Sequence, residues 1–317
     1  MAFLLKDLIK KQAPLASGHR MCAGCPAPVI VKQVLMSTDH PKVCTNATGC
    51  LEVATTIFPF TSWKVPWLHI AFENSAAAVS GVEAAYHGLA NKGELPEDMK
   101  NAKFIAFGGD GGTYDIGIQA LSGALERGHN MLYVCYDNEG YMNTGIQRSS
   151  ATPIGANTTT TPVGSQSYGK REIRKDLLSI VVAHHIPYAA TCAPHDWMDG
   201  MKKSQKAIET EGPAFLNYFS PCIPGWKIPA DAWRKLSELA VKTCFWPLIE
   251  VENGKWSLTG ESKRIADGKA EKVPAVEFMK NQGRFKHLFT QKKDDVLALI
   301  QADIDRSWDF YRKMAGY

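Results

Sequence analysis

The part of the chain that most constrains the fold is a pair of apolar segments. A glycine-rich turn and a stretch with helical spacing of apolar residues connect them. KFIAF (103–107) predicts a short buried strand, and GGDGG follows it directly. Apolar residues at helical spacing then predict a helix from Asp115 to about Arg127, and MLYVCYD (131–137) predicts a second buried strand. Parallel strands need a crossover connection of this kind, so the unit predicts a parallel sheet covered by helices.

The flanking segments continue this alternation of helices and strands. Four further segments show helical patterns and two show strand patterns: helices at 75–89, 177–186, 196–209 and 293–314, and strands at 187–192 and 213–222. We therefore expect an α/β protein with a doubly wound parallel sheet. Residues 1–222 are predicted to form the main domain. Residues 223–317 are predicted to form a C-terminal extension or arm that packs on it, and the sequence pattern from about 223 to 290 is irregular and rich in Pro, Gly and Trp.

Composition and charge narrow the classes of function. The 317 residues include 36 Lys and Arg against 32 Asp and Glu, and the net charge of +4 is too small to indicate a nucleic-acid-binding protein. No run of about 18 apolar residues predicts a transmembrane helix. The first residues, MAFLLKDLIKKQ, predict a short amphipathic helix and not a secretory signal. We expect a cytoplasmic protein whose eight cysteines are mostly reduced thiols.

The GGDGG turn and a second polar turn predict a site for a cation and a diphosphate. GGDGG does not match the glycine spacing of a dinucleotide-binding turn, and the Asp110 carboxylate would repel a phosphate unless a divalent cation bridged them. In DNEGYMNTGIQ (137–147), Asn138 can offer a side-chain oxygen and Gly140 a carbonyl to Mg²⁺, while Asn143 can bond a diphosphate. Both turns follow strands at the edge where doubly wound sheets bind ligands. Two ordinary turns are the alternative interpretation.

Cys22 and Cys25 form a C-x-x-C pair in GHRMCAGCPAP (18–28) that can bind a metal ion or a cluster. Four thiolates suit both an iron–sulfur cluster and a structural zinc ion, and spacing alone leaves both open. A thioredoxin-like redox pair would follow a strand, and no strand pattern precedes this pair. Four other cysteines have no partner at ligand spacing and are interpreted as core residues: Cys44, Cys135, Cys192 and Cys244.

Four stretches carry a resemblance to a known family. They are NATGCLEVATT, PWLHIAFENSAAAVSG, GGDGGTYDIGIQALSGALERG and YDNEGYMNTGIQRSSATP, and the similarity runs from about residue 18 to 225. The GDG turn with its Asn-bearing partner resembles the diphosphate-binding motif of thiamine diphosphate enzymes. Together, the stretches are similar to the β subunit of pyruvate:ferredoxin oxidoreductases. The resemblance implies a sheet of the thiamine-diphosphate-binding type with an N-terminal cluster-binding segment.

The resemblance also implies three cofactors, namely thiamine diphosphate, Mg²⁺ and one [4Fe–4S] cluster. The implied cluster ligands are Cys22, Cys25, Cys50 and Cys222, and the implied Mg²⁺ ligands are Asp110, Asn138 and Gly140. Further cofactor contacts are expected around these residues: Gly49, Cys50, Gly109, Asp110, Gly111, Gly112, Thr113, Asn138, Gly140, Asn143 and Thr144, with Asn143 as the candidate catalytic residue. In this family, the glutamate that activates thiamine comes from another subunit. Capping or structural roles are therefore expected for Glu52, Glu73 and Glu139.

The implied activity is the oxidative decarboxylation of pyruvate to acetyl-CoA and CO₂, with electrons passed to ferredoxin. The implied partners are an α subunit with a pyrimidine-binding domain, and ferredoxin-like and CoA-binding-type subunits of the same complex. Within the family, oxidation of oxalate to two CO₂ without CoA, or of another 2-oxoacid, is the alternative. Outside it, the chain could be a non-catalytic iron–sulfur electron-transfer subunit.

Overall fold

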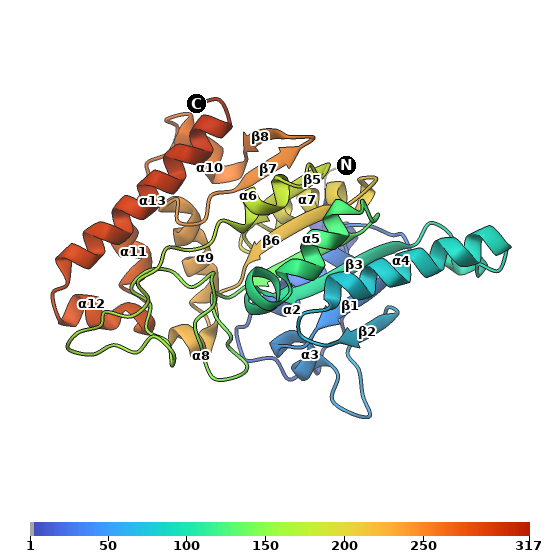
Figure 1. Cartoon of the computed structure of the whole chain (residues 1–317), viewed down its shortest axis with the longest axis horizontal. Helices are drawn as coiled ribbons and strands as arrows, with labels where there is room; N and C mark the ends of the chain where they lie inside the picture. The colour runs from blue at the N-terminus through green and yellow to red at the C-terminus, as the bar shows by residue number, and fades with distance from the viewer. Residues whose placement is uncertain (1–2) are drawn as a thin grey trace.

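The predicted strand–turn–helix–strand unit lies at the centre of an eight-stranded sheet (Figure 1). The computed structural model describes residues 3–317. The strand order is β2-β1-β3-β4-β6-β5-β7-β8, and the first six strands in this order are parallel. Their bounds are Lys42–Ala47 (β1), Trp67–Ile70 (β2), Lys103–Gly109 (β3), Leu132–Asp137 (β4), Tyr188–Cys192 (β5) and Ala214–Phe219 (β6). The predicted α/β fold with a largely parallel sheet is confirmed.

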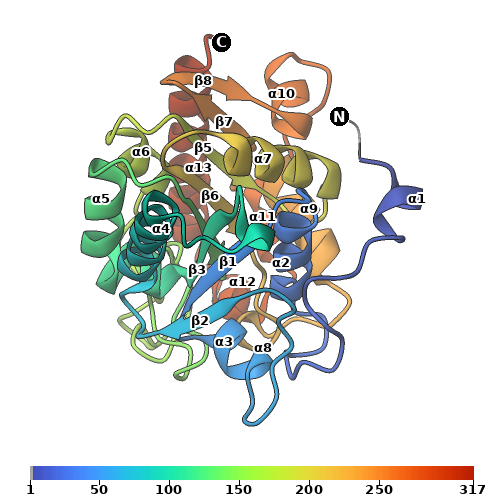
Figure 2. The same cartoon turned by 90° about the vertical axis from the view of Figure 1, so that its right-hand side faces the viewer.

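Helices cover both faces of this sheet, so its central strands are buried along their whole length. Every residue of β4, β5 and β6 is buried, as is typical of parallel strands between two helical layers. One face packs against α4 (Ser75–Lys92), α5 (Ile118–Glu126), α6 (Leu177–Val182) and α13 (Asp294–Met314). The other face packs against α2 (Ala27–Leu35) and α7 (Trp197–Glu209) (Figure 2). The cysteines predicted to be core residues are buried in these two layers: Cys44, Cys135, Cys192 and Cys244.

Three helices differ most from the sequence predictions. The helix expected from Asp115 begins earlier, as a π-helical turn at Gly111–Ile116 (η2) that leads into α5. Helix α6 ends at Val182 instead of 186, because the chain turns through His185 with a left-handed φ of 56°. The N-terminal amphipathic helix is reduced to one turn, α1 (Leu5–Leu8), and the first two residues of that prediction lie outside the described residues.

The stretch from about 223 to 290, whose sequence pattern is irregular, forms regular elements in the structure. Strand β7 (Ile249–Glu252) pairs antiparallel with β5, and β8 (Lys255–Leu258) pairs with β7, so the extension adds two strands to the sheet. Asn253 and Gly254 have positive φ angles, and this Asn-Gly pair is the overlooked sequence signal for the hairpin. The helices of this stretch are α8 (Ile223–Trp226), α9 (Trp233–Lys242), α10 (Gly260–Ala266), α11 (Ala275–Met279), η3 (Gly283–Phe285) and α12 (Lys286–Thr290).

The extension is joined to the sheet by an aromatic core. The ring of Phe219, the last residue of β6, packs against aromatic rings of the extension. The distances between ring centroids are 5.0 Å to Trp246, 5.5 Å to Trp226 and 6.1 Å to Phe278. Such tilted aromatic pairs add to the stabilisation that burial gives. The end of β6 and the extension therefore form one packed unit.

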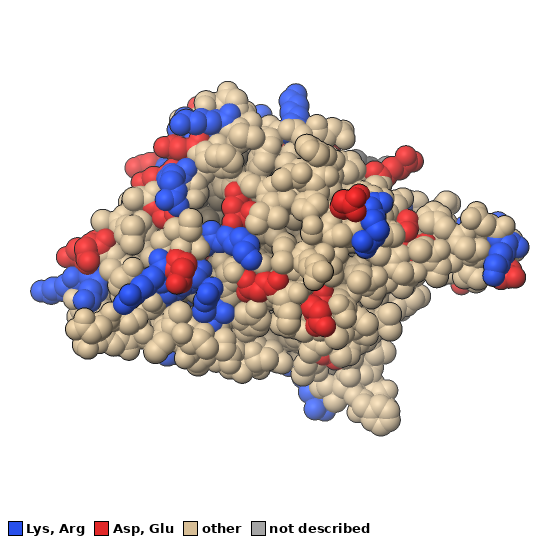
Figure 3. Space-filling view, in the orientation of Figure 1, with Lys and Arg blue, Asp and Glu red and all other residues tan. Residues whose placement is uncertain are grey.

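The outer surface shows no extended field of one charge on the face drawn in Figure 3, where acidic and basic side chains are interspersed. No described helix combines the length and apolarity needed to cross a membrane. The loop between α3 (Cys50–Thr55) and β2 projects from the molecule, at the bottom of Figure 1, and exposes Phe58 by 94% and Phe60 by 77%. A short helical turn, η1 (Glu97–Met99), follows α4.

Candidate active site

The carboxyl ends of β3 and β4 bring the two predicted polar turns together. The strands run parallel in a register that pairs Gly109 with Tyr136, so Asp110 and Asn138 emerge at the same edge of the sheet. The Asn138 backbone N–H donates a hydrogen bond to Asp110 Oδ1 at 3.2 Å. This is the edge at which open α/β sheets bind their ligands.

Three oxygen atoms converge between these turns. The side-chain oxygen of Asn138 lies 2.9 Å from Asp110 Oδ1 and 2.8 Å from the Gly140 carbonyl oxygen. Turning the amide would convert both contacts into hydrogen bonds, whereas a cation would hold all three oxygens as ligands. A carboxylate, an amide oxygen and a backbone carbonyl are the hard oxygen ligands that Mg²⁺ prefers, so the residues fit that ion.

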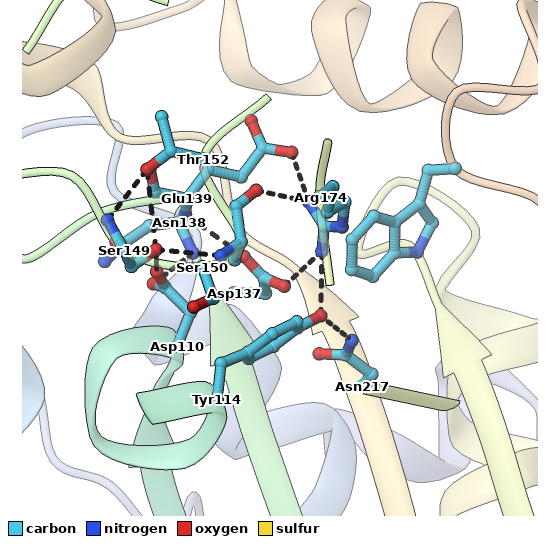
Figure 4. Close-up of polar contacts among 12 residues, drawn as sticks. Asp110, Tyr114, Asp137, Asn138, Glu139, Ser149, Ser150, Thr152, Arg174 and Asn217 are labelled. Carbon is cyan, nitrogen blue, oxygen red and sulfur yellow. Dashed lines mark hydrogen bonds and ion pairs between the residues drawn. The ribbon is translucent and has the colours of Figure 1, made fainter. Parts of the chain in front are cut away.

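Asp110 is buried among polar side chains from both turns (Figure 4). Burial raises the pKa of its carboxyl well above its usual range, and the nearby Asp137 carboxylate raises this pKa further. The Ser149 hydroxyl opposes the shift, because it donates a hydrogen bond to Asp110 Oδ2 at 2.5 Å. A cation beside Asp110 would favour the ionised carboxylate, which is the form that can act as a ligand.

A cavity of about 110 Å³ opens beside these oxygens. It is lined by most of the residues expected to contact a cofactor: Gly49, Cys50, Gly109, Asp110, Gly111, Asn138, Gly140, Asn143 and Thr144. Gly112 and Thr113 do not line it, and the Thr113 hydroxyl donates to the Gly109 carbonyl at 2.7 Å, so this side chain holds the turn. Sequence reasoning missed the larger side chains of the wall, which no local motif marks: Phe72, Tyr136, Tyr141 and Met142.

The cavity wall contains a hydrogen-bond donor that the protein does not use. The Tyr136 side chain is buried, and its hydroxyl has no hydrogen-bond partner among the described residues. A Cβ atom on Gly49 would lie 2.9 Å from that hydroxyl oxygen, so glycine at this position leaves the hydroxyl open to the cavity. Buried hydroxyls nearly always have a partner, and a diphosphate would supply the acceptor oxygens that this one lacks.

Two arginines neutralise the carboxylates of the second turn: the partly buried Arg174, which is drawn in Figure 4, and the buried Arg284. Arg174 forms ion pairs with Asp137 and, at 2.7 Å, with Glu139, and it donates to the Tyr114 hydroxyl at 2.9 Å. Arg284 approaches the other carboxylate oxygen of Glu139 to 2.6 Å. Glu139 therefore has the structural role expected from the sequence. The arginines were missed because they are distant from Glu139 in the sequence.

The four implied cluster ligands come from three segments of the chain. Cys22 and Cys25 lie in the loop before α2, Cys50 is the first residue of α3, and Cys222 immediately precedes α8. Burial, with a smaller contribution from neighbouring thiols of this group, raises the pKa of Cys25 and of Cys222 to about 12 and that of Cys50 to about 11. The fold therefore gathers thiols that lie far apart in the sequence.

This gathering differs from a site for one metal ion. Among residues 3–317, no three His, Cys, Asp or Glu side chains are placed to hold a single ion. A zinc ion needs its sulfur ligands at about 2.3 Å from one point. A [4Fe–4S] cluster binds each thiolate through a different iron and spreads its ligands over a larger body. The gathered thiols therefore form no ready-made site for a single ion among the described residues.

Comparison with known proteins identifies the family. A model of the C-terminal thiamine pyrophosphate-binding domain of thiamine pyrophosphate enzymes matches residues 47–218. The pyruvate synthase subunit PorB of Thermotoga maritima is 49% identical over 310 residues, which cover 96% of this chain and 93% of that protein. The chain belongs to the β subunits of 2-oxoacid:ferredoxin oxidoreductases. It is thus a subunit of a thiamine-diphosphate-dependent oxidoreductase that works with partner subunits, as the resemblance implied.

Other members of the family match over similar lengths. The pyruvate synthase subunit PorB of Methanocaldococcus jannaschii is 48% identical over 290 residues, which cover 92% of this chain and 93% of that protein. The ketoisovalerate oxidoreductase subunit VorB of Pyrococcus abyssi is 40% identical over 302 residues, with 94% and 92% covered. The solved 2-oxoglutarate:ferredoxin oxidoreductase of Magnetococcus marinus shares the fold, with a TM-score of 0.54 and 22% identity over 73% of this chain and 81% of that chain.

Proposed function

We propose that this β subunit takes part in the oxidative decarboxylation of pyruvate to acetyl-CoA and CO₂, with electrons passed to ferredoxin. The observation that supports this best is the convergence of the Asp110, Asn138 and Gly140 oxygens at a cavity that Cys50 also lines. These oxygens would hold Mg²⁺ at the diphosphate of the cofactor. Thiamine diphosphate supplies the carbanion chemistry of decarboxylation, and a [4Fe–4S] cluster takes up the electrons.

The other residues of the wall would bind and shield the cofactor. The Tyr136 hydroxyl would donate to an acceptor oxygen of the diphosphate. Asn143 and Thr144 would add polar contacts at the same wall, with Asn143 as the candidate for contact with the reacting part of the cofactor. Phe72 and Met142 would keep water away, which strengthens electrostatic interactions inside the cavity.

Cys22, Cys25, Cys50 and Cys222 are proposed as the ligands of the cluster. Cys50 would connect the two sites, because it lines the cavity and stands among the other thiols. The charge of Asp110 also contributes to the raised pKa of Cys50, so a cation ligand and a cluster ligand lie within electrostatic reach. The reduced thiols that a cluster needs suit a reducing compartment, and we propose the cytoplasm.

A second chain would complete the catalytic site. The described residues that line the cavity include no glutamate or histidine, which supports a thiamine-activating group supplied by another chain. We propose that it comes from the pyrimidine-binding domain of an α subunit. Ferredoxin-like and CoA-binding-type subunits of the same complex are proposed to carry the electrons onward and to deliver CoA.

The loop with Phe58 and Phe60 is proposed to contact a partner subunit. It directly follows α3, whose first residue lines the cavity, and two phenylalanines exposed this far are typical of an interaction site. The double change Phe58→Ser/Phe60→Ser is expected to reduce co-purification of the partner subunits several-fold while the melting temperature of the subunit stays unchanged. Phe310→Ser, on α13, is the control. Full assembly of the double variant would contradict this contact.

Pyruvate is proposed as the substrate because the PorB subunits of pyruvate synthases are 43 to 49% identical to this chain, against 40% for the VorB subunit of a ketoisovalerate oxidoreductase. The test is viologen reduction by the complex, purified without oxygen, with pyruvate, ketoisovalerate, 2-oxoglutarate or oxalate, each with and without CoA. Pyruvate activity that requires CoA is the expected result. Activity with ketoisovalerate alone would move the enzyme to that class, and oxalate activity without CoA to the oxalate oxidoreductases. Inactivity with every acid would favour a non-catalytic electron-transfer subunit.

A further inference from the structure

The turn that carries the proposed cation ligands has an unusual backbone conformation. Glu139, between Asn138 and Gly140, has a φ of 66°, in the left-handed region that residues other than glycine rarely occupy. The bend at this residue lets the Asn138 side chain and the Gly140 carbonyl face Asp110 together. Such a conformation persists only where the surrounding structure holds it.

Glu139 is held through both its backbone and its side chain. Its N–H donates to Asp137 Oδ1 at 3.1 Å, and its carbonyl accepts a hydrogen bond from the Thr152 hydroxyl at 2.6 Å. One carboxylate oxygen accepts a hydrogen bond from Arg174 at 2.7 Å. The other lies 2.6 Å from Arg284 Nη2. This second contact is an ion pair without a hydrogen bond.

Arg284 is itself fixed by its surroundings in the extension. Its side chain is 3% exposed, and its Nε donates to Gln282 Oε1 at 2.8 Å. Its guanidinium group lies 3.7 Å from the ring centre of Trp226, and Trp226 Nε1 in turn donates to the Asn138 carbonyl at 2.9 Å. The stacked pair Arg284 and Trp226 therefore holds the turn at two successive residues.

We propose that Arg284 is a positioning residue for the cation site, which it serves by holding Glu139 and, through it, the turn from Asn138 to Gly140. The proposal rests on the proposed function, since it takes Asp110, Asn138 and Gly140 as the cation ligands. Residues that orient metal ligands affect metal affinity strongly although they never touch the metal, typically by about 10- to 100-fold. The extension thereby acquires a role in cofactor binding.

Charge alone and positioning predict opposite results when Arg284 is replaced. Without the buried positive charge beside Glu139, the site would by charge alone attract a cation more strongly. Loss of the turn geometry would weaken binding instead. Arg284→Lys keeps the charge but loses the planar stack and the forked geometry, so positioning predicts weaker binding there as well.

The test measures Mn²⁺, as a substitute for Mg²⁺, bound by the purified complex in the presence of thiamine diphosphate, from the electron paramagnetic resonance signal of free Mn²⁺. Arg284→Met is expected to weaken Mn²⁺ binding by about 10- to 100-fold, and Arg284→Lys by less. Arg264→Met removes an exposed arginine of the same extension, paired with Glu261, and is expected to leave binding unchanged. Equal or tighter binding by Arg284→Met would overturn the proposal.

Arg284→Met leaves the Glu139 carboxylate with one fewer buried partner and can impair folding. The double variant Arg284→Met/Glu139→Gln removes both charges, so assembly is expected to recover while Mn²⁺ binding stays weak. If the double variant assembles and binds Mn²⁺ as the wild type does, the positioning role is refuted. Asp110→Asn separates the two proposals. If it binds Mn²⁺ as tightly as the wild type, the cation site itself is wrong. If it loses binding while the Arg284 variants keep it, only the positioning role fails.

Discussion

The proposed cation site and the cysteine site adjoin at Cys50 but are built in opposite ways. At the cation site, the protein holds the ligands: Ser149 bonds the Asp110 carboxylate, and Trp226 and the Glu139 ion pairs fix the facing turn. At the cysteine site, the ligands arrive on three separate segments, and their thiols are raised in pKa by burial and by one another. The first site is preorganised by hydrogen bonds and ion pairs. The second would depend on the proposed cluster to tie the segments together, as in many proteins whose metal binding is coupled to folding.

The largest effect is expected when one cysteine ligand is removed. Cys222→Ser should prevent assembly of the cluster, because no other contact replaces the bond that joins the α8 segment to it. The purified complex is expected to contain about four fewer iron atoms per protomer and to lose viologen reduction, while it keeps thiamine diphosphate. Cys244→Ala, at a cysteine buried in the core, is the control and should keep its iron. Unchanged iron in Cys222→Ser would contradict the assignment of this ligand.

A smaller effect is expected at Ser149, which supports one cation ligand. Its hydrogen bond lowers the pKa of Asp110, so Ser149→Ala should raise that pKa further. The carboxylate is then protonated at a higher pH, and Mn²⁺ binding should fall off at a higher pH than in the wild type. The shift is measured by following bound Mn²⁺ from about pH 5 to about pH 8, the range in which proteins are usually most stable.

Ser150→Ala is the matched control for that experiment. The Ser150 backbone N–H bonds Asp115, whereas its hydroxyl makes no hydrogen bond within residues 3–317. Its pH profile should therefore follow the wild type. Identical profiles for all three proteins would show that Ser149 does not influence the cation site.

The smallest effect is expected at Trp226, where a single neutral hydrogen bond can be removed. Trp226→Phe keeps a ring beneath Arg284 but loses the bond to the Asn138 carbonyl, which is worth about 0.5–1.5 kcal/mol. Mn²⁺ binding should weaken by about 2- to 10-fold. Trp246→Phe loses a similar bond, at 3.0 Å to the Cys192 carbonyl, and keeps a ring beside Arg174, so it removes no hydrogen bond to the turn. If both variants weaken binding equally, the effect is one of general stability.

The sequence could predict those parts of the fold and the site that depend on the local pattern of apolar and polar residues. Strands β3 and β4 are apolar runs, and the register of adjacent parallel strands places Asp110 beside Asn138. A motif position does not tell where a side chain points, so Thr113 was expected at the cofactor although its hydroxyl bonds the turn. Contacts between distant segments leave no local signal either. Glu139 and Arg284 each look ordinary in the sequence, and only folding brings them together.

The aromatic joint between β6 and the extension has a consequence for how such subunits can be recombined. The segment shared with other thiamine pyrophosphate enzymes ends at residue 218, one residue before Phe219. Cys222, Trp226 and Arg284 all lie beyond that boundary. The segment shared with other thiamine pyrophosphate enzymes is therefore shorter than the unit that forms the proposed sites. A chimaera joined at residue 218 would keep the turns after β3 and β4 but replace the residues that hold them, Trp226 and Arg284. A domain exchange between oxidoreductases therefore has to include the extension.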